Sequence, residues 1–193
     1  DSSPEMLRMA RARLQHLPAD SFDLVQGDFA KLSLNASFRR PLFNEKTNVA
    51  VSIYGQLANK NLNSAEQLYL GGPFAVRSYP VAQGGGAQGA VASIELTHNV
   101  QNEFQVGAFV DAGLVQQYVT PYAGWQGLTN ANNMYSLYGA GLLAKYSYER
   151  VQLQAALAWR VGGNPLYTQS GQQLNVDNQY KQLQIWVKGS FFF

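Results

Sequence analysis

The sequence predicts an all-β protein, a transmembrane antiparallel β-barrel, on three observations. Charged residues make up only 13% of the 193 residues, while aromatic residues reach 12% and glycines number 18. The usual charged share is about 25%. Long segments alternate apolar and polar side chains with a period of two, and no run approaches the roughly 20 apolar residues of a membrane helix. Membrane barrels hide their apolar face in such alternation.

The alternation begins at Asp28 and returns in about seven segments, with strands of roughly 10 to 15 residues expected, as in outer-membrane barrels. In the first segment Leu32, Leu34 and Phe38 share one face, and polar residues share the other. Trp186 falls on the polar face of the last segment and breaks the pattern. The expected strands cover residues 31–39, 48–57, 92–97, 103–114, 138–148, 151–161 and 182–193.

The connections between these segments alternate short and long. The short ones are 41–46, 99–102 and 149–150, whereas 59–89, 116–134 and 162–180 are long. In outer-membrane barrels the short turns face the periplasm and the long loops face outward. A soluble sandwich needs neither this asymmetry nor strands longer than about 5–6 residues. The membrane barrel, and with it the bacterial outer membrane, is therefore favoured.

Composition also excludes several classes of function. The chain has no cysteine, so it can hold no disulfide and no thiolate metal site. Absence of cysteine suits passage through an oxidising periplasm. The net charge of +2 is too small to indicate nucleic-acid binding.

The number of strands predicts that the barrel is incomplete. Bacterial single-chain barrels have an even number of strands, and seven strands that start from an outer loop cannot close by that rule. We therefore expect the C-terminal portion of a larger barrel, with 1–27 as an extracellular loop containing a short helix and 28–193 as the barrel portion. The alternative is a missed strand between Glu5 and Gln26, which would give a small eight-stranded barrel.

The connection 59–89 is the strongest functional signal in the sequence. A structureless loop longer than about 12–15 residues is usually functional or disordered, and this one carries Arg77 between apolar and aromatic residues. Glu95 and Asp111 fall on the inward faces of the two following strands. If the loop folds back into the lumen, Arg77 can offer its donors to both acids. The alternative is a mobile surface loop with a chance arginine.

At these residues the sequence resembles the TpsB transporters, the outer-membrane partners of two-partner secretion, of haemolysin-activator type. The resemblance rests on Gly71-Gly72-Pro73-x-x-Val76-Arg77-x-Tyr79-Pro80, on Ser93-Ile94-Glu95-Leu96 and on Phe109-x-Asp111-x-Gly113. It implies a barrel of sixteen strands, of which two precede the in-folding loop here and five follow it. The family's periplasmic POTRA domains, plug helix and first strands are not in this sequence.

The resemblance also implies roles for individual residues. Arg77 would anchor the loop tip, Asp111 would be its partner on the inner wall, and Glu95 would be a second acid nearby. Ser78 stands where glycine or another small residue is usual, which fits the TpsB branch better than the barrel-assembly insertases. The terminal Phe193 resembles the signal that the barrel-assembly machinery reads. The loop motif comprises Gly71, Gly72, Pro73, Val76, Arg77, Ser78 and Tyr79.

The expected function is secretion of a large TpsA-type client, a haemolysin or adhesin, without a cofactor and without bond chemistry. The expected partners are this client, outer-membrane lipid and the barrel-assembly machinery, with no nucleic acid. Alternatives are an insertase relative, a passive plugged barrel, or an outer-membrane phospholipase or protease. His16 and His98 are the only histidines, and no nucleophile elbow is present, so the sequence favours no enzyme.

Overall fold

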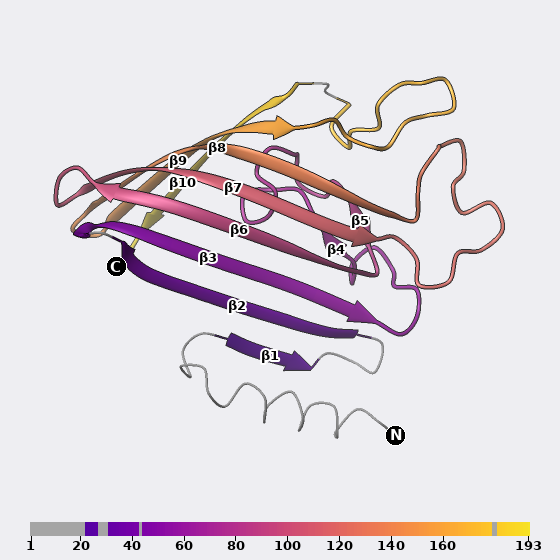
Figure 1. Cartoon of the computed structure of the whole chain (residues 1–193), viewed down its shortest axis with the longest axis horizontal. Coiled ribbons are helices and arrows are strands. Elements are labelled where there is room, and N and C mark those ends of the chain that lie inside the picture. The colour runs from indigo at the N-terminus through magenta and orange to yellow at the C-terminus, as the bar shows by residue number, and fades with distance from the viewer. Residues whose placement is uncertain (1–21, 27–30, 43, 179–180) are drawn as a thin grey trace.

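The computed structural model describes residues 22–26, 31–42, 44–178 and 181–193, and this part of the chain is all β (Figure 1). One antiparallel sheet has eight strands in the order β1-β2-β3-β6-β7-β8-β9-β10, and β4 and β5 form a small separate hairpin. The large sheet consists of β1 (Phe22–Gln26), β2 (Lys31–Leu42), β3 (Asn44–Ala58), β6 (Gln88–Asn99), β7 (Phe104–Gln116), β8 (Met134–Tyr148), β9 (Val151–Val161) and β10 (Leu183–Phe191). The hairpin consists of β4 (Leu68–Tyr69) and β5 (Gly85–Gly86).

The seven strands predicted from alternation correspond to β2, β3 and β6 to β10. The structure adds β1, which pairs with β2 from Phe22↔Ala36 to Gln26↔Leu32. This strand lies in the segment that the sequence analysis assigned to a loop, because five residues are too few to reveal a period of two. The expected short helix falls outside the described residues. Among the strands that the structure describes, the two edges β1 and β10 are not paired with each other.

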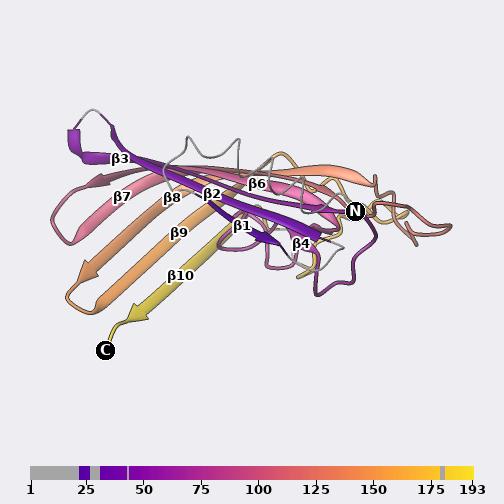
Figure 2. The ribbon, with the colours of Figure 1, turned by 90° about the horizontal axis from the view of Figure 1, so that it is seen from below.

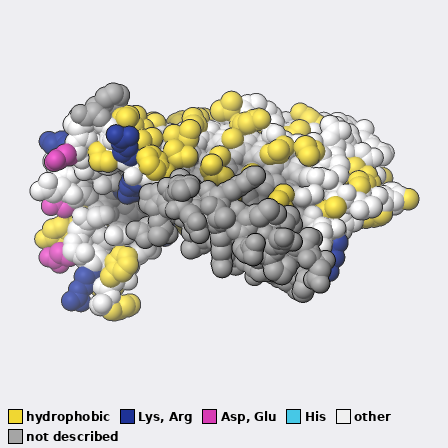
Figure 3. Space-filling view, turned by 60° about the horizontal axis from the view of Figure 1, so that its bottom comes forward, with side chains coloured by type: hydrophobic (Ala, Val, Ile, Leu, Met, Phe, Trp, Pro, Cys, Tyr) yellow, Lys and Arg dark blue, Asp and Glu magenta, His cyan; other side chains and the backbone are white. Residues whose placement is uncertain are grey.

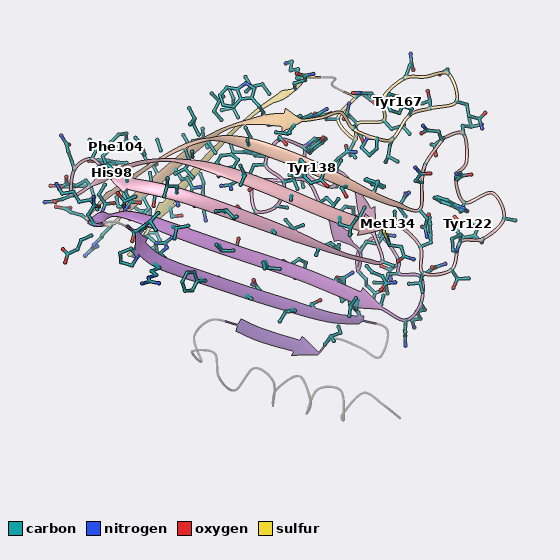
Figure 4. All side chains as sticks on the ribbon, in the orientation of Figure 1. His98, Phe104, Tyr122, Met134, Tyr138 and Tyr167 are labelled. Atoms are coloured by element: carbon teal, nitrogen blue, oxygen red, sulfur yellow. The ribbon has the colours of Figure 1, made fainter. Side chains whose placement is uncertain are left out.

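The sheet is strongly curved and twisted (Figures 1 and 2). The short turns β2–β3, β6–β7 and β8–β9 gather at one end, which we call the turn end, together with the C-terminus. The long connections gather at the other end, which we call the long-loop end. In Figure 4 His98 and Phe104 mark the turn end, and Tyr122 and Tyr167 lie on two connections at the long-loop end. In the described part of the chain no helix has the length and apolar character needed to cross a membrane.

One face of the sheet is a continuous apolar surface, because the register aligns the apolar phase of neighbouring strands. Many of its large side chains are exposed, among them Ile53, Val110 and Leu142. Figure 3 shows hydrophobic side chains along the length of the molecule, with acidic and most of the basic groups gathered at the turn end. One row crosses seven strands through the paired residues Phe38, Val51, Ile94, Val110, Ala140, Trp159 and Leu183.

The opposite face, which we call the inner face, is covered by the connection between β3 and β6. This connection, residues 59–87, carries the β4–β5 hairpin and is called the in-folded loop below. Figures 1 and 2 show it gathered on one side of the curved sheet. The main core lies between the loop and the strands, and it consists of Leu68, Leu70, Val76 and Tyr79 from the loop with Val91, Val115, Tyr135 and Leu137 from β6, β7 and β8.

Candidate functional site

The tip of the in-folded loop is a compact turn that presents Arg77 to the inner face. The amide of Val76 donates to the carbonyl of Leu70 (2.8 Å), and the amide of Gly72 donates to the carbonyl of Tyr79 (3.1 Å). Gly72 has φ of 125°, a conformation that L side chains rarely adopt. A Cβ at Gly71 would collide with the carbonyl oxygen of Pro80. The two glycines therefore let the chain reverse tightly enough to aim residue 77 at the wall.

Asp111 on β7 is the central acceptor of the site, and its side chain has no exposed surface. Its Oδ2 accepts from the backbone amide of Arg77 (3.0 Å) and from Arg77 Nε (2.9 Å). Its Oδ1 accepts from Arg77 Nη2 (2.7 Å) and from the hydroxyl of Ser93 (2.7 Å). Four hydrogen bonds thus satisfy a fully buried carboxylate, which is the condition under which a buried charge is tolerated.

Ser93 and Glu95 on β6 complete the shell around the guanidinium. Arg77 Nη2 donates to Ser93 Oγ (2.8 Å), and Arg77 Nη1 lies 2.5 Å from Glu95 Oε1. The second oxygen of Glu95 accepts from Lys145 Nζ on β8 (3.0 Å). Glu95 and Lys145 keep 19% and 22% of their side chains exposed. The ion-pair chain therefore runs from a dry centre at Asp111 to a wetter edge at Lys145.

Two aromatic residues on the inner face hold Arg77 from other sides. The Phe109 ring lies under the guanidinium, with Arg77 Cζ 3.5 Å from the ring centroid, in a cation–π contact. The indole Nε1 of Trp186 on β10 donates to the backbone carbonyl of Arg77 (2.7 Å). This hydrogen bond explains why a tryptophan interrupts the polar face of the last strand.

The carboxylates around Arg77 favour its charged form. Burial disfavours the charged guanidinium, but the hydrogen bonds and charges of Asp111 and Glu95 outweigh it and raise the pKa of Arg77 above its ordinary value. Arg77 is therefore charged in this site, as arginine is in proteins generally.

Glycines on the strands make room for the loop tip. A Cβ built at Gly113 on β7 would lie 2.9 Å from Leu70 and 3.0 Å from Val76. A Cβ built at Gly139 on β8 would collide with the side chain of Ser78. Because real Cβ atoms essentially never approach other heavy atoms within 3.0 Å, the glycines on the wall allow the close approach of the loop.

The described residues hold no cluster of histidine, aspartate and glutamate that could bind a metal ion. His98 lies at the turn end, where its Nδ1 is 2.9 Å from the hydroxyl of Thr47 (Figure 4). His16 falls outside the described residues. The arrangement around Arg77 holds the loop tip against the inner face through hydrogen bonds and ion pairs.

The comparison with protein families decides the class of this protein. A family model described as haemolysin secretion/activation protein ShlB/FhaC/HecB matches residues 8–142, more than half of the chain. The chain belongs to this family. No curated protein and no solved structure matches it.

The ShlB/FhaC/HecB family consists of outer-membrane transporters of Gram-negative bacteria that serve two-partner secretion, and it is not an enzyme family. The resemblance to TpsB transporters, the all-β architecture and the outer-membrane location predicted from sequence are therefore confirmed. The family also implies a secreted partner of the TpsA type.

The residues that the sequence analysis singled out in this ShlB/FhaC/HecB chain lie in two separate places, the loop tip with its facing strands and the C-terminus. The structure brings Arg77, Asp111 and Glu95 into direct contact. Phe193 lies apart from them, fully exposed beyond β10, with its ring centroid 5.2 Å from that of Phe191. The loop-motif residues Gly71, Gly72, Val76, Ser78 and Tyr79 are buried, and Pro73 is half-buried.

Sequence reasoning missed roles for three inward-facing residues of the site. Ser93 and Phe109 stood inside the quoted motifs without a role, and Lys145 was not singled out. The period of two could have placed all three on the inward face, because each lies at an alternating position that faces the same side as Glu95 or Asp111. Alternation gives the face of a residue, but the height at which side chains of different strands meet depends on register and tilt.

Proposed function

We propose that this chain forms part of the wall and the lock of an outer-membrane pore that secretes a large partner protein of haemolysin or adhesin type. Transport in this proposal is a matter of binding and conformational change, with no bond made or broken. The observation that carries it is the buried contact of Arg77 with Asp111, Glu95 and Ser93, which holds the in-folded loop against the inner face. In the loop's resting position the lumen side of the sheet is covered.

The chemistry of the contact suits a lock with two states. Separating a buried ion pair leaves two uncompensated charges, so partial opening is strongly disfavoured and the loop is either seated or withdrawn. The partly exposed pair of Glu95 and Lys145 gives water a place to enter the site first. The client would supply the free energy for opening by binding the open state more tightly than the closed one.

Secretion of the cognate client tests the proposal in the complete transporter. We expect Arg77→Ala and Asp111→Ala each to impair secretion, because either variant leaves a buried charge without its partner. Lys60→Ala is the matched control, since Lys60 is an exposed cation of the same loop and makes no ion pair within the described part of the chain. Normal secretion by both lock variants would contradict the role assigned to the pair, and would favour a passive plugged barrel.

A charge swap tests whether the two residues act through direct contact. Arg77→Asp combined with Asp111→Arg retains one cation and one carboxylate at the same two positions. We expect this double variant to secrete more client than either single charge reversal. Equal secretion by all three variants would indicate that the residues act separately.

We infer two further partners of the chain. Outer-membrane lipid suits the continuous apolar face of β2 to β10, because a lipid-facing surface needs no polar partners. The barrel-assembly machinery would read the exposed terminal Phe193. Phe193→Ala should lower the amount of assembled protein in the outer membrane, whereas Phe74→Ala, at an exposed aromatic of the in-folded loop, should not. We infer no nucleic-acid partner, in keeping with the small net charge.

A further inference from the structure

A second set of buried polar contacts, which does not involve Asp111, also holds the in-folded loop. It joins Gln83 of the loop and Arg160 of β9 to residues 162–178, the described part of the connection between β9 and β10. We call the contacts of Gln83, Arg160, Asn164 and Asn175 the outer anchor, and those of Arg77 with Ser93, Glu95 and Asp111 the inner anchor. The hydrogen bonds of these four residues go to backbone groups and side-chain amides. The carboxylate of Asp177 in the same segment adds an attractive charge for Arg160.

Gln83 pairs with the segment 162–178 as a strand would. Its Nε2 donates to the carbonyl of Leu174 (3.2 Å), and its Oε1 accepts from the amide of Val176 (3.0 Å). The side chain is only 1% exposed, so both hydrogen bonds are shielded from water. One amide side chain therefore uses its donor and its acceptor to bind two backbone groups 91 and 93 positions away.

The backbone around Gln83 is bent to present this side chain. Ala82 has φ of 66° and Gly84 has φ of 70°, so Gln83 stands between two left-handed residues. An alanine in this region is unfavourable and persists only where its surroundings over-determine it. The hydrogen bonds of Gln83 and the buried position of the loop supply that constraint.

Arg160 ties the loop tip to the same segment. Its Nε donates to the backbone carbonyl of Ser78 (3.1 Å), and its Nη1 donates to the side-chain oxygen of Asn175 (3.0 Å). Its guanidinium also lies over the Tyr79 ring, with Cζ 4.6 Å from the centroid. Arg160 thus contacts the residue directly after Arg77 and links it to residues 162–178.

The segment 162–178 makes contacts within itself and with a neighbouring connection. The fully buried Asn164 donates through Nδ2 to the carbonyl of Leu174 and to Asn175 Oδ1. Toward the long-loop end, the amide of Asn130 donates to the carbonyl of Tyr167 (3.0 Å), and the amide of Tyr167 donates to Asn130 Oδ1 (2.8 Å). Tyr122 and Tyr167 mark these two connections in Figure 4. The outer anchor is therefore continuous with the surface connections.

We propose that residues 162–178 are a second anchor for the in-folded loop, and that Gln83 is the positioning residue that couples this surface segment to the lock. The inference rests on the proposed function, in which the loop must leave the inner face for transport. Withdrawal of the loop then requires the outer anchor to open as well. A partner that pulls residues 162–178 away at the cell surface would loosen the loop without touching Arg77.

Thiol labelling of a buried reporter tests this coupling without using secretion. Val76→Cys places a thiol at a fully buried site of the loop tip, in a chain that has no other cysteine. In the complete transporter in outer membranes, with any cysteines outside this stretch replaced, we expect Gln83→Ala to raise the labelling rate of this thiol about tenfold, because two buried hydrogen bonds are lost. Gln172→Ala is the matched control, since Gln172 is exposed in the same surface segment.

Two further variants make the result specific. Asn175→Ala removes the partner of Arg160 from the surface segment alone, and it should also raise labelling of Val76→Cys. Leu62→Cys is a second buried reporter near the start of the loop, in a separate cluster with Ala87, and its labelling should not change. If the Gln83→Ala variant does not assemble, the labelling rate of Val76→Cys in the Asn175→Ala variant is sufficient to test the second anchor.

The outcomes separate this inference from the proposed function. Labelling at Val76→Cys equal to that of the Gln172→Ala control, or an equal rise at both reporters, would overturn the second anchor. A selective rise at Val76→Cys would support it, whatever the level of secretion. Failure of the transport proposal would appear instead as normal secretion by Arg77→Ala and Asp111→Ala.

Discussion

Arg77 and Arg160 are both buried against the in-folded loop, yet they are held by different chemistry. All three guanidinium nitrogens of Arg77 donate to Asp111, Glu95 or Ser93. Arg160 donates to a backbone carbonyl and to an asparagine side chain, and its Nη2 has no hydrogen-bond partner within the described residues. The inner anchor is thus built on hydrogen-bonded ion pairs. In the outer anchor the hydrogen bonds of Arg160 go to neutral acceptors, and the charge of Asp177 adds an electrostatic attraction.

The difference has an energetic consequence. Removing one partner of a buried, hydrogen-bonded ion pair costs about 3–5 kcal/mol, whereas a lost neutral hydrogen bond at a buried site costs about 1–3 kcal/mol. The outer anchor should therefore open more readily than the inner one. The outer anchor also lies near the long-loop end. Its contacts are therefore closer to the surface connections and should break before those of the inner anchor.

The largest effect is expected where the inner anchor loses its carboxylate. Asp111→Ala leaves the cation of Arg77 buried with fewer acceptors, and we expect the seated loop to lose about 3–5 kcal/mol of stability. The measurement is the labelling rate of the Val76→Cys thiol, which should rise by at least a hundredfold. Glu45→Ala, at an exposed acid of the turn end, is the control and should leave the rate unchanged. If Asp111→Ala raised the labelling rate less than Gln83→Ala does, the outer anchor would contribute more to the stability of the seated loop than the inner one.

A substitution on the wall should disturb the loop tip between the two anchors. A Cβ at Gly139 meets Ser78, whose neighbour Arg77 belongs to the inner anchor and whose carbonyl belongs to the outer one. We expect Gly139→Ala to destabilise the seated loop by about 1–3 kcal/mol through overpacking. Gly55→Ala is the matched control, because a Cβ there has its nearest neighbour at 3.8 Å. Equal labelling of Val76→Cys in the two variants would show that the wall glycine is not needed for close approach.

A smaller effect is expected from the hydrogen bond that joins β10 to the inner anchor. Trp186→Phe retains an aromatic ring and removes the indole donor to the carbonyl of Arg77, so the loss should be about 0.5–1.5 kcal/mol. The labelling rate should rise about threefold to tenfold. Trp159→Phe, on the exposed apolar face, provides the comparison at a tryptophan of the opposite phase. If both variants behave alike, the loss reflects the smaller ring and not the donor.

The smallest effect should come from the wetter edge of the inner anchor. Lys145 and Glu95 are about one-fifth exposed, so solvent screens their ion pair, and Lys145→Gln should cost only about 0.2–1 kcal/mol. Raising the salt concentration should reduce the difference between this variant and the native chain. Asp111→Ala should show no such dependence. A strong salt effect on Asp111→Ala would mean that the centre of the anchor is wet.

The sequence alone determined the seven long strands and their two faces, and it singled out the long connection with the three charged residues Arg77, Glu95 and Asp111. The reason is that a period of two assigns every residue of a long strand to a face, and polar residues on the inward face stand out. The short strand β1 could not be found in this way, because its five residues carry too little of the pattern.

Only the tertiary structure decided which inward residues meet. The inward position of Trp186 is explained by its hydrogen bond to the loop tip, and that of Lys145 by its ion pair with Glu95. The contacts of Gln83, Arg160 and Asn175 carry no sequence signal, because amide side chains in loops follow no period and can pair with any backbone group within reach. Periodicity therefore specified the long strands and their faces, and the chain path of the loops specified which contacts hold the in-folded loop against the sheet.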